Sequence, residues 1–382
     1  MTTFDMGKRV QQPNGFRAFI PAKFPPISRM DLPRSLAQSH MEAARLLGKL
    51  DGIAALLPDR DCFLKMFIQK DASNSSQIEG TNATMIDVIE QQNVEPRASI
   101  PADVDDILHY IEALKYGLER SRELPFSLRF IKELHEKLMT GARSTQAACP
   151  GQFRKTQNWI GGTRPDNAKF IPPPPDEMMR ALGDLEKFIH DQNDYLPLMK
   201  AGLLHAQFEA IHPFVDGNGR TGRILITMYL WKEGLLDMPL LYLSTYFKKH
   251  QQLYYEKLDA YHHGHVYEWL SFFFDGIIET AESAIDSCRK ITALRERDMR
   301  KIQALGKTSA SSTLTILTQL YAMPIVGIAD IVKWTDFSRP GGYKAIERMI
   351  AMEILKPMNQ GEIAYNQKWM YEDYLRIFAS EV

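Results

Sequence analysis

The chain has 382 residues, more than a single hydrophobic core usually serves, so two or three domains are expected. Its apolar fraction of 45% and charged fraction of 24% are ordinary for a globular protein, and its 46 Lys and Arg residues balance its 47 Asp and Glu residues. This balance excludes a molecule whose overall charge recruits nucleic acid or an anionic membrane, so any phosphate-binding site must be a local arrangement.

The cysteines and the apolar runs indicate in which cellular compartment the protein is expected. Cys62, Cys149 and Cys288 are odd in number and far apart, which excludes a disulfide framework or a zinc knuckle and fits a reducing compartment. Charged residues and prolines interrupt the N-terminal stretch, so no signal-peptide core is expected. The longest apolar run near the middle, residues 224–231, is too short to span a bilayer. Together these features predict a soluble, cytoplasmic protein.

The order of the predicted elements indicates a mainly α protein with one hairpin. Residues 1 to about 33 are rich in Pro and Gly and are expected to form an extended arm that lies on the rest of the molecule. Apolar residues then recur at helical spacing from Ser35 to Leu57. Further helices are predicted at residues 60–77, 82–92, 102–120, 127–139, 176–190, 197–210, 220–234, 248–261 and 265–304. The clearest strand-like sequence lies between Arg154 and Ile171.

The tail from about residue 309 predicts a small separate module. A helix at 314–321, two helical stretches between 325 and 350, and a following hairpin give the order of a winged helix-turn-helix domain. Two functions stay open for it. Lys344 and Arg348 lie one turn apart and could read DNA. The tail is only slightly basic, however, and electrostatics usually dominates DNA affinity, so a docking or dimer module is favoured.

The chemistry is predicted to lie in one segment, Ile211-His-Pro-Phe-Val-Asp-Gly-Asn-Gly-Arg-Thr-Gly-Arg223. Pro213 biases His212 away from the α region, so the preceding helix should end there and place the imidazole on a loop. Asn218 and the glycines beside it are turn formers, and their backbone N–H groups can form an anion-binding nest. A new helix opens near Arg220, and the start of a helix favours phosphate.

The same segment supplies the other groups that a nucleotide site needs. Arg220 and Arg223 lie on neighbouring positions of the first helical turn. Asp216 is a carboxylate able to hold Mg²⁺, and His212 is a candidate base. The usual P-loop pattern is absent, so this cradle is of a different kind. The alternative is an ordinary turn beside a solvated helix face, and we favour the nucleotide site because all of these residues converge on one phosphate task.

These thirteen residues resemble the signature of the Fic family, His-Pro-Phe-x-Asp/Glu-Gly-Asn-Gly/Lys-Arg-x-x-Arg, and every defining position is filled. The resemblance extends less sharply from about Cys62 to Gly276. It implies a compact helical core that binds ATP and Mg²⁺ and transfers AMP to Ser, Thr or Tyr hydroxyls of proteins, including the chain itself. The expected division is an N-terminal arm and helical extension (1–60), a Fic domain with an inhibitory helix at about 61–80 and a long C-terminal helix (61–305), and a winged-helix domain (306–382).

The resemblance also implies a role for each residue of the signature. His212 would accept the proton of the target hydroxyl, Asp216 would hold Mg²⁺ between the α- and β-phosphates, and Phe214 would anchor the loop in the core. A glycine at position 219, where some relatives have lysine, favours AMP transfer over a kinase-like variant. The implied nucleotide-binding residues are Gly217, Asn218, Gly219, Arg220, Thr221, Gly222 and Arg223, with Tyr255 and His262 as weaker candidates beside the adenine.

An inhibitory element is also implied. Ser75-Ser-Gln-Ile-Glu79-Gly80 resembles the family's inhibitory pattern, Ser/Thr-x-x-x-Glu-Gly/Asn. Physically, the segment reads as a helix end with Gly80 as the cap, where the helix dipole disfavours a carboxylate, so Glu79 should have a cationic partner. The family pattern implies Arg223, whose guanidinium would then be unable to orient the γ-phosphate. The alternative is a surface glutamate that ends a helix.

The strand-like segment between Arg154 and Ile171 resembles the family's flap, a hairpin beside the active site whose edge can pair with an extended target segment. Ile160, Gly161 and Gly162 would then lie close to the nucleotide or the target. The alternative is a purely structural hairpin.

The remaining histidines have structural explanations, and several other functions stay open. His205 is expected to be a packed, satisfied side chain. His262, His263 and His265 lack partner acids or cysteines at ligand spacing, which favours a helix terminus over a metal site. A homodimer, removal of AMP or transfer of another phosphate-containing group by the same site, and a DNA-binding regulator with a nucleotide-sensing site stay open.

Overall fold

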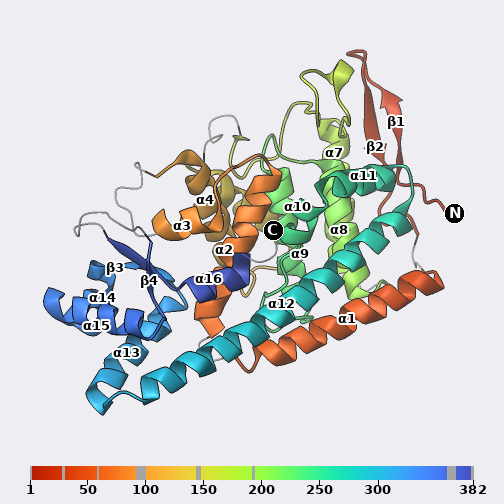
Figure 1. Cartoon of the computed structure of the whole chain (residues 1–382). Helices are drawn as coiled ribbons and strands as arrows, with labels where there is room; N and C mark the ends of the chain where they lie inside the picture. The colour runs from red at the N-terminus through yellow and green to blue at the C-terminus, as the bar shows by residue number, and fades with distance from the viewer. Residues whose placement is uncertain are drawn as a thin grey trace.

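Helices make up most of the chain in the computed structural model, which describes residues 2–27, 31–57, 60–91, 100–142, 148–191, 194–358 and 367–379 (Figure 1). The helices of the central part are α1 (Arg34–Ala54), α2 (Arg60–Ile78), α3 (Met85–Gln91), α4 (Ala102–Arg120), α5 (Leu128–Met139), α7 (Pro175–His190), α8 (Pro197–Ile211), α9 (Asn218–Lys232), α10 (Ser244–Lys249), α11 (Gln251–His262) and α12 (Val266–Gln303). Within the described ranges, no helix is both long and apolar enough to cross a membrane.

Helices α8 and α9 form the centre of this bundle. Every residue of α8 from Leu198 to Ile211 is buried, and so is every residue of α9 from Arg220 to Leu230. A helix that is buried on all sides has neighbours all round, and here they include α2, α5, α7, α11 and α12. The loop that joins α8 to α9 carries the signature, so two buried helices hold it from both ends.

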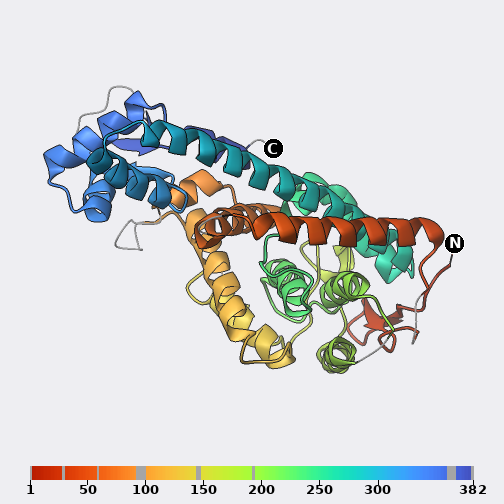
Figure 2. The same cartoon turned by 90° about the horizontal axis from the view of Figure 1, so that it is seen from below.

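Helices α1 and α12 form one side of the molecule and lie side by side along most of α1 (Figures 1 and 2). Both are amphipathic, with buried residues such as Leu46 and Leu50 on α1 and Trp269 and Ile277 on α12. The length of α12 carries the chain away from the bundle, so the elements that directly follow it lie at the far end of the molecule.

Helix α2 is unusual because buried polar residues line its second half. Asp71 accepts hydrogen bonds from the Tyr110 hydroxyl (2.7 Å) and from the Ser244 backbone N–H (3.3 Å). The Asn74 side chain donates to Thr245 Oγ1 (2.9 Å). Buried polar groups are costly unless they are paired, so these bonds fix the rotation of α2 about its axis. That rotation decides where the last turn of the helix points.

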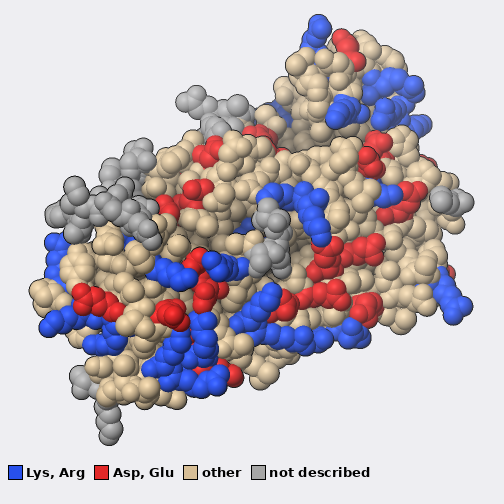
Figure 3. Space-filling model, in the orientation of Figure 1, with Lys and Arg blue, Asp and Glu red and all other residues tan. Residues whose placement is uncertain are grey.

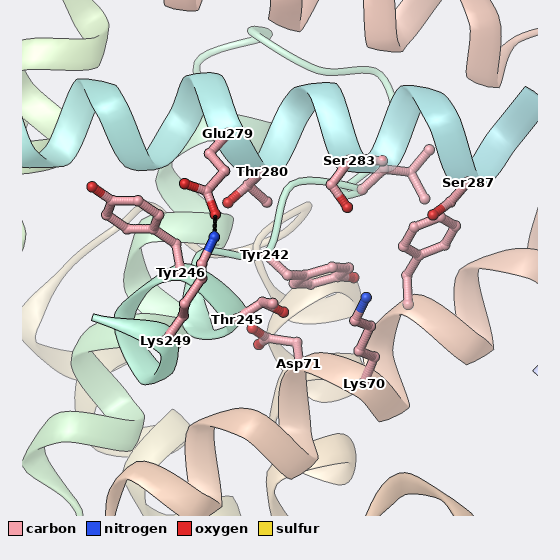
Figure 4. Close-up of a pocket in the computed structure, with 13 residues that line it drawn as sticks. Lys70, Asp71, Tyr242, Thr245, Tyr246, Lys249, Glu279, Thr280, Ser283 and Ser287 are labelled. Atoms are coloured by element: carbon pink, nitrogen blue, oxygen red, sulfur yellow. Dashed lines mark hydrogen bonds and ion pairs between the residues drawn. The ribbon is translucent and has the colours of Figure 1, made fainter. Parts of the chain in front are cut away.

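A cavity of about 320 Å³ lies between α2, α10 and α12 (Figure 4). The side chains of Lys70 and Asp71 reach it from α2, Lys249 reaches it from α10, and Glu279 and Ser287 reach it from α12. None of its lining residues belongs to the signature. The cavity is therefore not the predicted nucleotide site.

The N-terminal arm lies on the rest of the molecule as predicted, but it contains a hairpin that the sequence analysis missed. Strands β1 (Gly7–Gln11) and β2 (Arg17–Pro21) pair in antiparallel register, with Gly7 opposite Pro21 and Gln11 opposite Arg17. The backbone N–H of Phe19 donates to the carbonyl of Ile171 (2.8 Å), which attaches the hairpin to the segment that was expected to form the flap.

That segment contains less strand than predicted. Its pairing is a single bridge between Ile160 and Phe170, and the turn between them contains the short 3₁₀ helix η2 (Pro165–Asn167). The Asn167 side chain accepts hydrogen bonds from the backbone N–H groups of Thr163 and Arg164, both at 2.9 Å. Local side-chain bonds of this kind compete with strand pairing, and this competition explains the correction.

The C-terminal part contains the three predicted helices followed by strands, and in addition a strand, β3, and a last helix, α16, that were not predicted. Its elements are α13 (Lys307–Leu320), β3 (Ile325–Gly327), α14 (Ile328–Thr335), α15 (Arg339–Ala351), β4 (Lys356–Pro357), β5 (Lys368–Met370) and α16 (Glu372–Ala379). Strand β5 pairs in antiparallel fashion with both β3 and β4. The turn expected after β4 lies outside the described residues, and the assignment as a winged helix stays a prediction.

Two contacts of this C-terminal part were not foreseen. Helix α16 packs back on α2, with the rings of Phe378 and Phe67 5.2 Å apart in an edge-on contact. Arg348 donates to Thr313 Oγ1 (3.3 Å), whereas Lys344 is exposed. The two cations expected to read DNA together therefore differ in their surroundings, and DNA binding stays a prediction.

Candidate active site

The signature loop leaves α8 and enters α9 through two left-handed backbone positions. Helix α8 ends at Ile211, and His212 follows with φ 49° and ψ 61°, a region that non-glycine residues rarely adopt. Gly217 precedes α9 with φ 78°. The predicted end of the helix before Pro213 is therefore confirmed, and the imidazole of His212 lies at the start of the loop.

Asn218 closes this loop through its side chain. Its Oδ1 accepts from the Phe214 backbone N–H (2.8 Å), and its Nδ2 donates to the Phe214 carbonyl (2.9 Å). The amide therefore shapes the loop, and the contact of Asn218 with a nucleotide stays a prediction. The ring of Phe214 is fully buried, as expected for an anchor.

His135 of α5 supports the signature loop through its ring and both ring nitrogens, and the sequence analysis missed it. Its ring stacks on Phe214 with 3.6 Å between the centroids. His135 Nδ1 accepts from the Gly151 N–H (3.0 Å), so Nε2 carries the hydrogen and donates to the Asp216 carbonyl (2.9 Å). Burial lowers the pKa of His135 to about 4, which keeps this neutral form at physiological pH.

Arg154 supports the strained His212 backbone and was likewise missed as a site residue. Its Nε donates to the His212 carbonyl (2.9 Å), and its terminal nitrogens donate to the carbonyls of Thr156 (3.0 Å) and Pro173 (2.6 Å). The side chain is buried, and burial lowers its pKa to about 10. A cation at this place also suits the negative C-terminal end of α8.

The predicted contact between Glu79 and Arg223 is present. The Arg223 guanidinium lies 2.7 Å from Glu79 Oε1 and also donates to the hydroxyl (2.8 Å) and the carbonyl (2.9 Å) of Ser75. Burial alone would lower the pKa of Arg223, but the Glu79 charge raises it. The last turn of α2 therefore occupies the guanidinium, whose side chain is only 2% exposed.

The end of α2 is capped as the sequence predicts. The N–H of Gly80 donates to the Gln77 carbonyl (3.1 Å), and the N–H of Thr81 donates to the Ser76 carbonyl (3.2 Å). Gly80 has φ 95°, so these are the two bonds of a Schellman cap. The cap ends the helix at the place that turns Glu79 toward α9.

Glu79 also lies against the start of α9. A Cβ atom at position 219 would collide with its carboxylate, so only glycine leaves room for Glu79 there. The first turn of a helix attracts anions because its N–H groups are free and its dipole is positive. A carboxylate now takes the position that the sequence predicts for phosphate.

Arg220 and Asp216 are placed to meet a charged ligand. Arg220 is buried, and its Nε has no hydrogen-bond partner among the described residues. Its guanidinium lies 3.9 Å from Asp216 Oδ1, and the Asp216 side chain is about half exposed. Within the described residues no cluster of three His, Cys, Asp or Glu side chains forms a metal site. Any Mg²⁺ would therefore depend on Asp216 together with ligand phosphates.

Two of the expected nucleotide contacts, Thr221 and Gly222, lie at packing positions. Thr221 is fully buried, and a Cβ atom at Gly222 would collide with the Glu209 carboxyl group of α8. Successive helix positions point in different directions, so residues 221 and 222 face the core while 219, 220 and 223 face the site. The contact of Thr221 and Gly222 with a nucleotide stays a prediction.

Beside the loop, His212, whose side chain is 19% exposed, lies against the buried Glu209. Glu209 Oε2 lies 3.7 Å from His212 Nδ1. Burial and the Arg154 charge lower the pKa of His212 to about 4, and burial raises the pKa of Glu209 to about 8. At neutral pH the imidazole is therefore uncharged and able to accept a proton.

The two weaker candidates lie on α11. Tyr255 is about half exposed, and burial together with the Glu79 charge raises its pKa. The His262 ring stacks on Phe170 at 4.0 Å, and neither of its ring nitrogens has a partner among the described residues. His205 is fully buried and packed as predicted, with Nε2 2.8 Å from the Tyr254 hydroxyl. Its Nδ1 has no hydrogen-bond partner among the described residues, so the expectation that the side chain is satisfied holds for one nitrogen only.

The remaining predicted residues form the tip of the flap segment. Ile160 is half-buried at its bridge to Phe170, whereas Gly161 and Gly162 are exposed. Asn158, just before them, donates to the Phe214 carbonyl (3.0 Å) of the signature loop. The flap segment and the signature are therefore in direct contact.

Comparison with known proteins places this site in a family. Residues 125–230 match the Fic/DOC family, and residues 37–119 match the N-terminal region of the Fic/DOC family. A probable protein adenylyltransferase of Aquifex aeolicus is 30% identical over 194 residues, which cover 49% of this chain and 54% of the relative. A protein adenylyltransferase Fic of Nematostella vectensis is 28% identical over 231 residues, which cover 56% of this chain and 47% of the relative. The chain thus spans about half the length of these relatives.

A solved structure extends the likeness of the fold. A Fic family protein from Desulfovibrio desulfuricans G20 superimposes with a TM-score of 0.58 at 17% identity, covering 90% of this chain and 97% of that one. At this identity the likeness supports the fold and not a shared activity.

The hydrogen bonds that Arg154 donates to backbone carbonyls yield a prediction about stability. Arg154→Lys keeps the charge but cannot supply the same fork of donors to several carbonyls, so buried acceptors are left unpaired. We expect a loss of roughly 2 kcal/mol or more, seen as a lower Tm in thermal unfolding. The exposed neighbour Lys155 provides the control, since Lys155→Ala should leave the Tm unchanged. Equal Tm values for the parent and Arg154→Lys would show that these hydrogen bonds do not stabilise the protein.

Proposed function

Since the chain belongs to the Fic/DOC family, we propose that it is a protein adenylyltransferase, which transfers AMP from ATP to a hydroxyl side chain of a protein. The observation that carries the proposal is the loop between α8 and α9. It brings an uncharged His212, the carboxylate of Asp216 and the buried guanidinium of Arg220 to the start of a helix. The names of the similar proteins support the same activity.

The nucleotide would be held mainly by its phosphates. Arg220 Nε is a buried donor without a partner among the described residues, and such an atom fits an anionic ligand. The free N–H groups at the start of α9 fit phosphate for the same reason. Tyr255 and the unpartnered ring nitrogens of His262 would face the adenine ring of the nucleotide. When bound at Asp216, Mg²⁺ would supply charge neutralisation at the phosphates.

His212 acts as the general base. The hydroxyl oxygen of the target forms a new bond to the α-phosphorus, the bond between that phosphorus and the β-phosphate oxygen breaks, and pyrophosphate leaves. The proton of the hydroxyl passes to the His212 imidazole, which is unprotonated at neutral pH because its pKa is lowered to about 4. The other residues of the site contribute positioning and charge neutralisation.

Glu79 inhibits this transfer in the resting protein. Its carboxylate is paired with Arg223 and lies at the start of α9, so it competes with nucleotide phosphate for both the cation and the helix terminus. Ser75 holds the same guanidinium from the same helix turn. An ATP molecule that enters this arrangement cannot place its γ-phosphate on Arg223.

The target would dock on the flap and the N-terminal hairpin, where basic side chains gather at the upper right of the molecule (Figure 3). The exposed cations of these segments are Lys8, Arg9, Arg17, Lys155, Arg164 and Lys169, against the exposed acids Asp5 and Asp166. The chain as a whole is balanced in charge, so this excess is local. An extended target segment with acidic residues near its hydroxyl would complement it.

Removing the carboxylate of Glu79 tests the transferase activity and its inhibition by Glu79 together. We expect Glu79→Gly to raise transfer of label from α-labelled ATP to protein by at least tenfold, which corresponds to about 1.4 kcal/mol in the barrier. Adding His212→Ala should abolish the label. Glu119→Gly, at an exposed glutamate of α4, serves as the control and should leave transfer at the parent's rate. If Glu79→Gly and the parent transfer AMP equally fast, Glu79 is not inhibitory.

The pKa of His212 sets the acid limit of the reaction. A base with its pKa near 4 stays unprotonated above pH 5, and removing the Glu79 charge lowers that pKa further because the charge raises it. In the Glu79→Gly background, kcat/KM should therefore be nearly constant between pH 7 and pH 5 and fall only as the pH approaches 4. A half-maximal rate near pH 6.5 would indicate an ordinary solvent-exposed histidine instead.

The basic docking surface predicts a preference among peptides. In the Glu79→Gly background, a serine peptide flanked by Asp and Glu should be modified faster than the same peptide flanked by Lys, and added salt should reduce the difference. Reversing two charges, Lys8→Glu with Arg9→Glu, should weaken this preference. Lys187→Glu, on α7, is the control. A preference that the two reversals leave unchanged would exclude the hairpin as the docking surface.

A further inference from the structure

The cavity between α2, α10 and α12 lies outside the signature. We propose that it binds a small organic acid whose carboxylate lies beside Lys70, and that this ligand holds α2 in its inhibitory position (Figure 4). The volume of the cavity, about 320 Å³, is in the range of sites for small molecules. The inhibitory effect rests on the proposed function, whereas binding of the acid does not depend on it.

One end of the cavity is suited to an anionic group. Figure 4 shows the ammonium group of Lys70 and the hydroxyl groups of Tyr242 and Ser283 pointing toward the same space. Ser287 lines the cavity one helical turn further along α12. An ammonium group together with hydroxyl donors can bind an oxyanion. Because the other lysine of the lining, Lys249, lies toward the opposite end, a single carboxylate matches this place better than the several charges of a nucleotide.

The hydroxyl group of Tyr242 lacks a hydrogen-bond partner. The residue is 4% exposed, and its hydroxyl oxygen has no partner among the described residues. Burial raises the pKa of Tyr242, and the Asp71 charge acts in the same direction, so the hydroxyl keeps its hydrogen and remains a donor. Buried donors are nearly always paired. A ligand oxygen at this end of the cavity would supply the missing acceptor.

The two acids of the lining are engaged within the protein. Glu279 accepts a hydrogen bond from Lys249 (2.6 Å). Asp71 accepts from the Tyr110 hydroxyl (2.7 Å) and from the Ser244 backbone N–H (3.3 Å). These contacts compensate the charge of both carboxylates and weaken the repulsion that an incoming carboxylate would meet.

Much of the remaining lining is apolar or aromatic, and these side chains are Phe67, Leu240, Tyr246 and Ala284. Such walls would cover the hydrocarbon part of the ligand, and an aromatic ring can pack against Phe and Tyr rings. The ligand class is therefore a carboxylic acid with a small apolar or aromatic body.

A line of buried contacts connects the cavity to Arg223. Asp71, which lines the cavity, accepts a hydrogen bond from the Tyr110 hydroxyl. Burial raises the pKa of Tyr110, and the side chain of Ser75, which lies beside it, acts in the opposite direction. Ser75 in turn accepts a hydrogen bond from Arg223 Nε (2.8 Å). Lys70 belongs to the same helix as Asp71 and Ser75, so a ligand on Lys70 acts on the helix that holds the guanidinium.

The direction of the effect follows from linkage. A ligand stabilises the arrangement of the protein to which it binds best. The cavity is formed by the arrangement of α2, α10 and α12 in which Glu79 is paired with Arg223. An acid that fills the cavity therefore makes this contact harder to break, and it slows AMP transfer without touching the signature.

Binding is tested with benzoate on the full-length protein by isothermal titration calorimetry. We expect saturable binding, and benzamide, which has nearly the same shape without the charge, should bind roughly tenfold more weakly. Lys70→Gln should weaken benzoate binding about fivefold, because it removes the cation. Lys65→Gln, at an exposed lysine of α2 outside the cavity lining, is the control and should match the parent. Absence of saturable binding, or equal affinities of the parent and Lys70→Gln, would overturn the proposal.

Two further variants decide where benzoate binds. Ser283→Phe places a ring in the cavity and should abolish binding, with a Tm close to that of the parent as the check on folding. Arg220→Ala, in the signature, should leave the affinity for benzoate unchanged. If binding is lost in Arg220→Ala and kept in Ser283→Phe, the acid binds at the signature and the proposal is wrong.

The effect on the reaction is tested by AMP transfer from α-labelled ATP. Saturating benzoate should slow the residual transfer of the parent about fivefold and leave Glu79→Gly unaffected, because that variant lacks the contact that the ligand stabilises. Equal slowing of both proteins would contradict an action through Glu79 and Arg223. Absence of transfer in Glu79→Gly itself would refute the proposed function, while the calorimetry would still decide whether the cavity binds the acid.

Discussion

The site is organised around one guanidinium, that of Arg223. It is almost completely buried, and a buried cation needs compensation from opposite charge and hydrogen bonds. In the resting protein, Glu79 and Ser75 of α2 provide both. In the proposed reaction, the γ-phosphate provides the charge instead. One guanidinium cannot bind Glu79 and the γ-phosphate in the same geometry. The contact between Glu79 and Arg223 that stabilises the resting protein must therefore break before catalysis.

The position of α2 links this contact to the rest of the chain. Its polar residues Asp71 and Asn74 are bonded to α4 and to the region of α10, its first half packs on α16 of the C-terminal part, and a cavity borders it. The helix end that presents Glu79 is therefore fixed by contacts from three directions. Any event that shifts α2 by part of a turn would change the Arg223 contact directly, since Ser75 and Glu79 lie on its last turn and cap.

The sequence predicted the parts of this arrangement that depend on local backbone chemistry. Pro213 ends α8, Gly80 caps α2, and the pairing of Glu79 with Arg223 followed from a family pattern. The missed residues act over long sequence distances. His135 and Arg154 hold the loop through backbone carbonyls, and a single histidine or arginine in a helix or loop carries no signal of such contacts. The packing role of Gly222 likewise depends on a side chain of another helix. The N-terminal hairpin differs, because its two strands are neighbours in sequence and flank Pro13, Asn14 and Gly15, a local turn signal that was missed.

The most direct test of the central claim is a crystal structure of the parent protein and of Glu79→Gly, each with a non-hydrolysable ATP analogue and Mg²⁺. The account predicts that the γ-phosphate contacts Arg223 only in the variant, and that in the parent the Glu79–Arg223 contact persists while the γ-phosphate lies elsewhere. A parent structure in which the γ-phosphate contacts Arg223 while Glu79 keeps its ion pair would show that the two do not compete, and it would contradict the account.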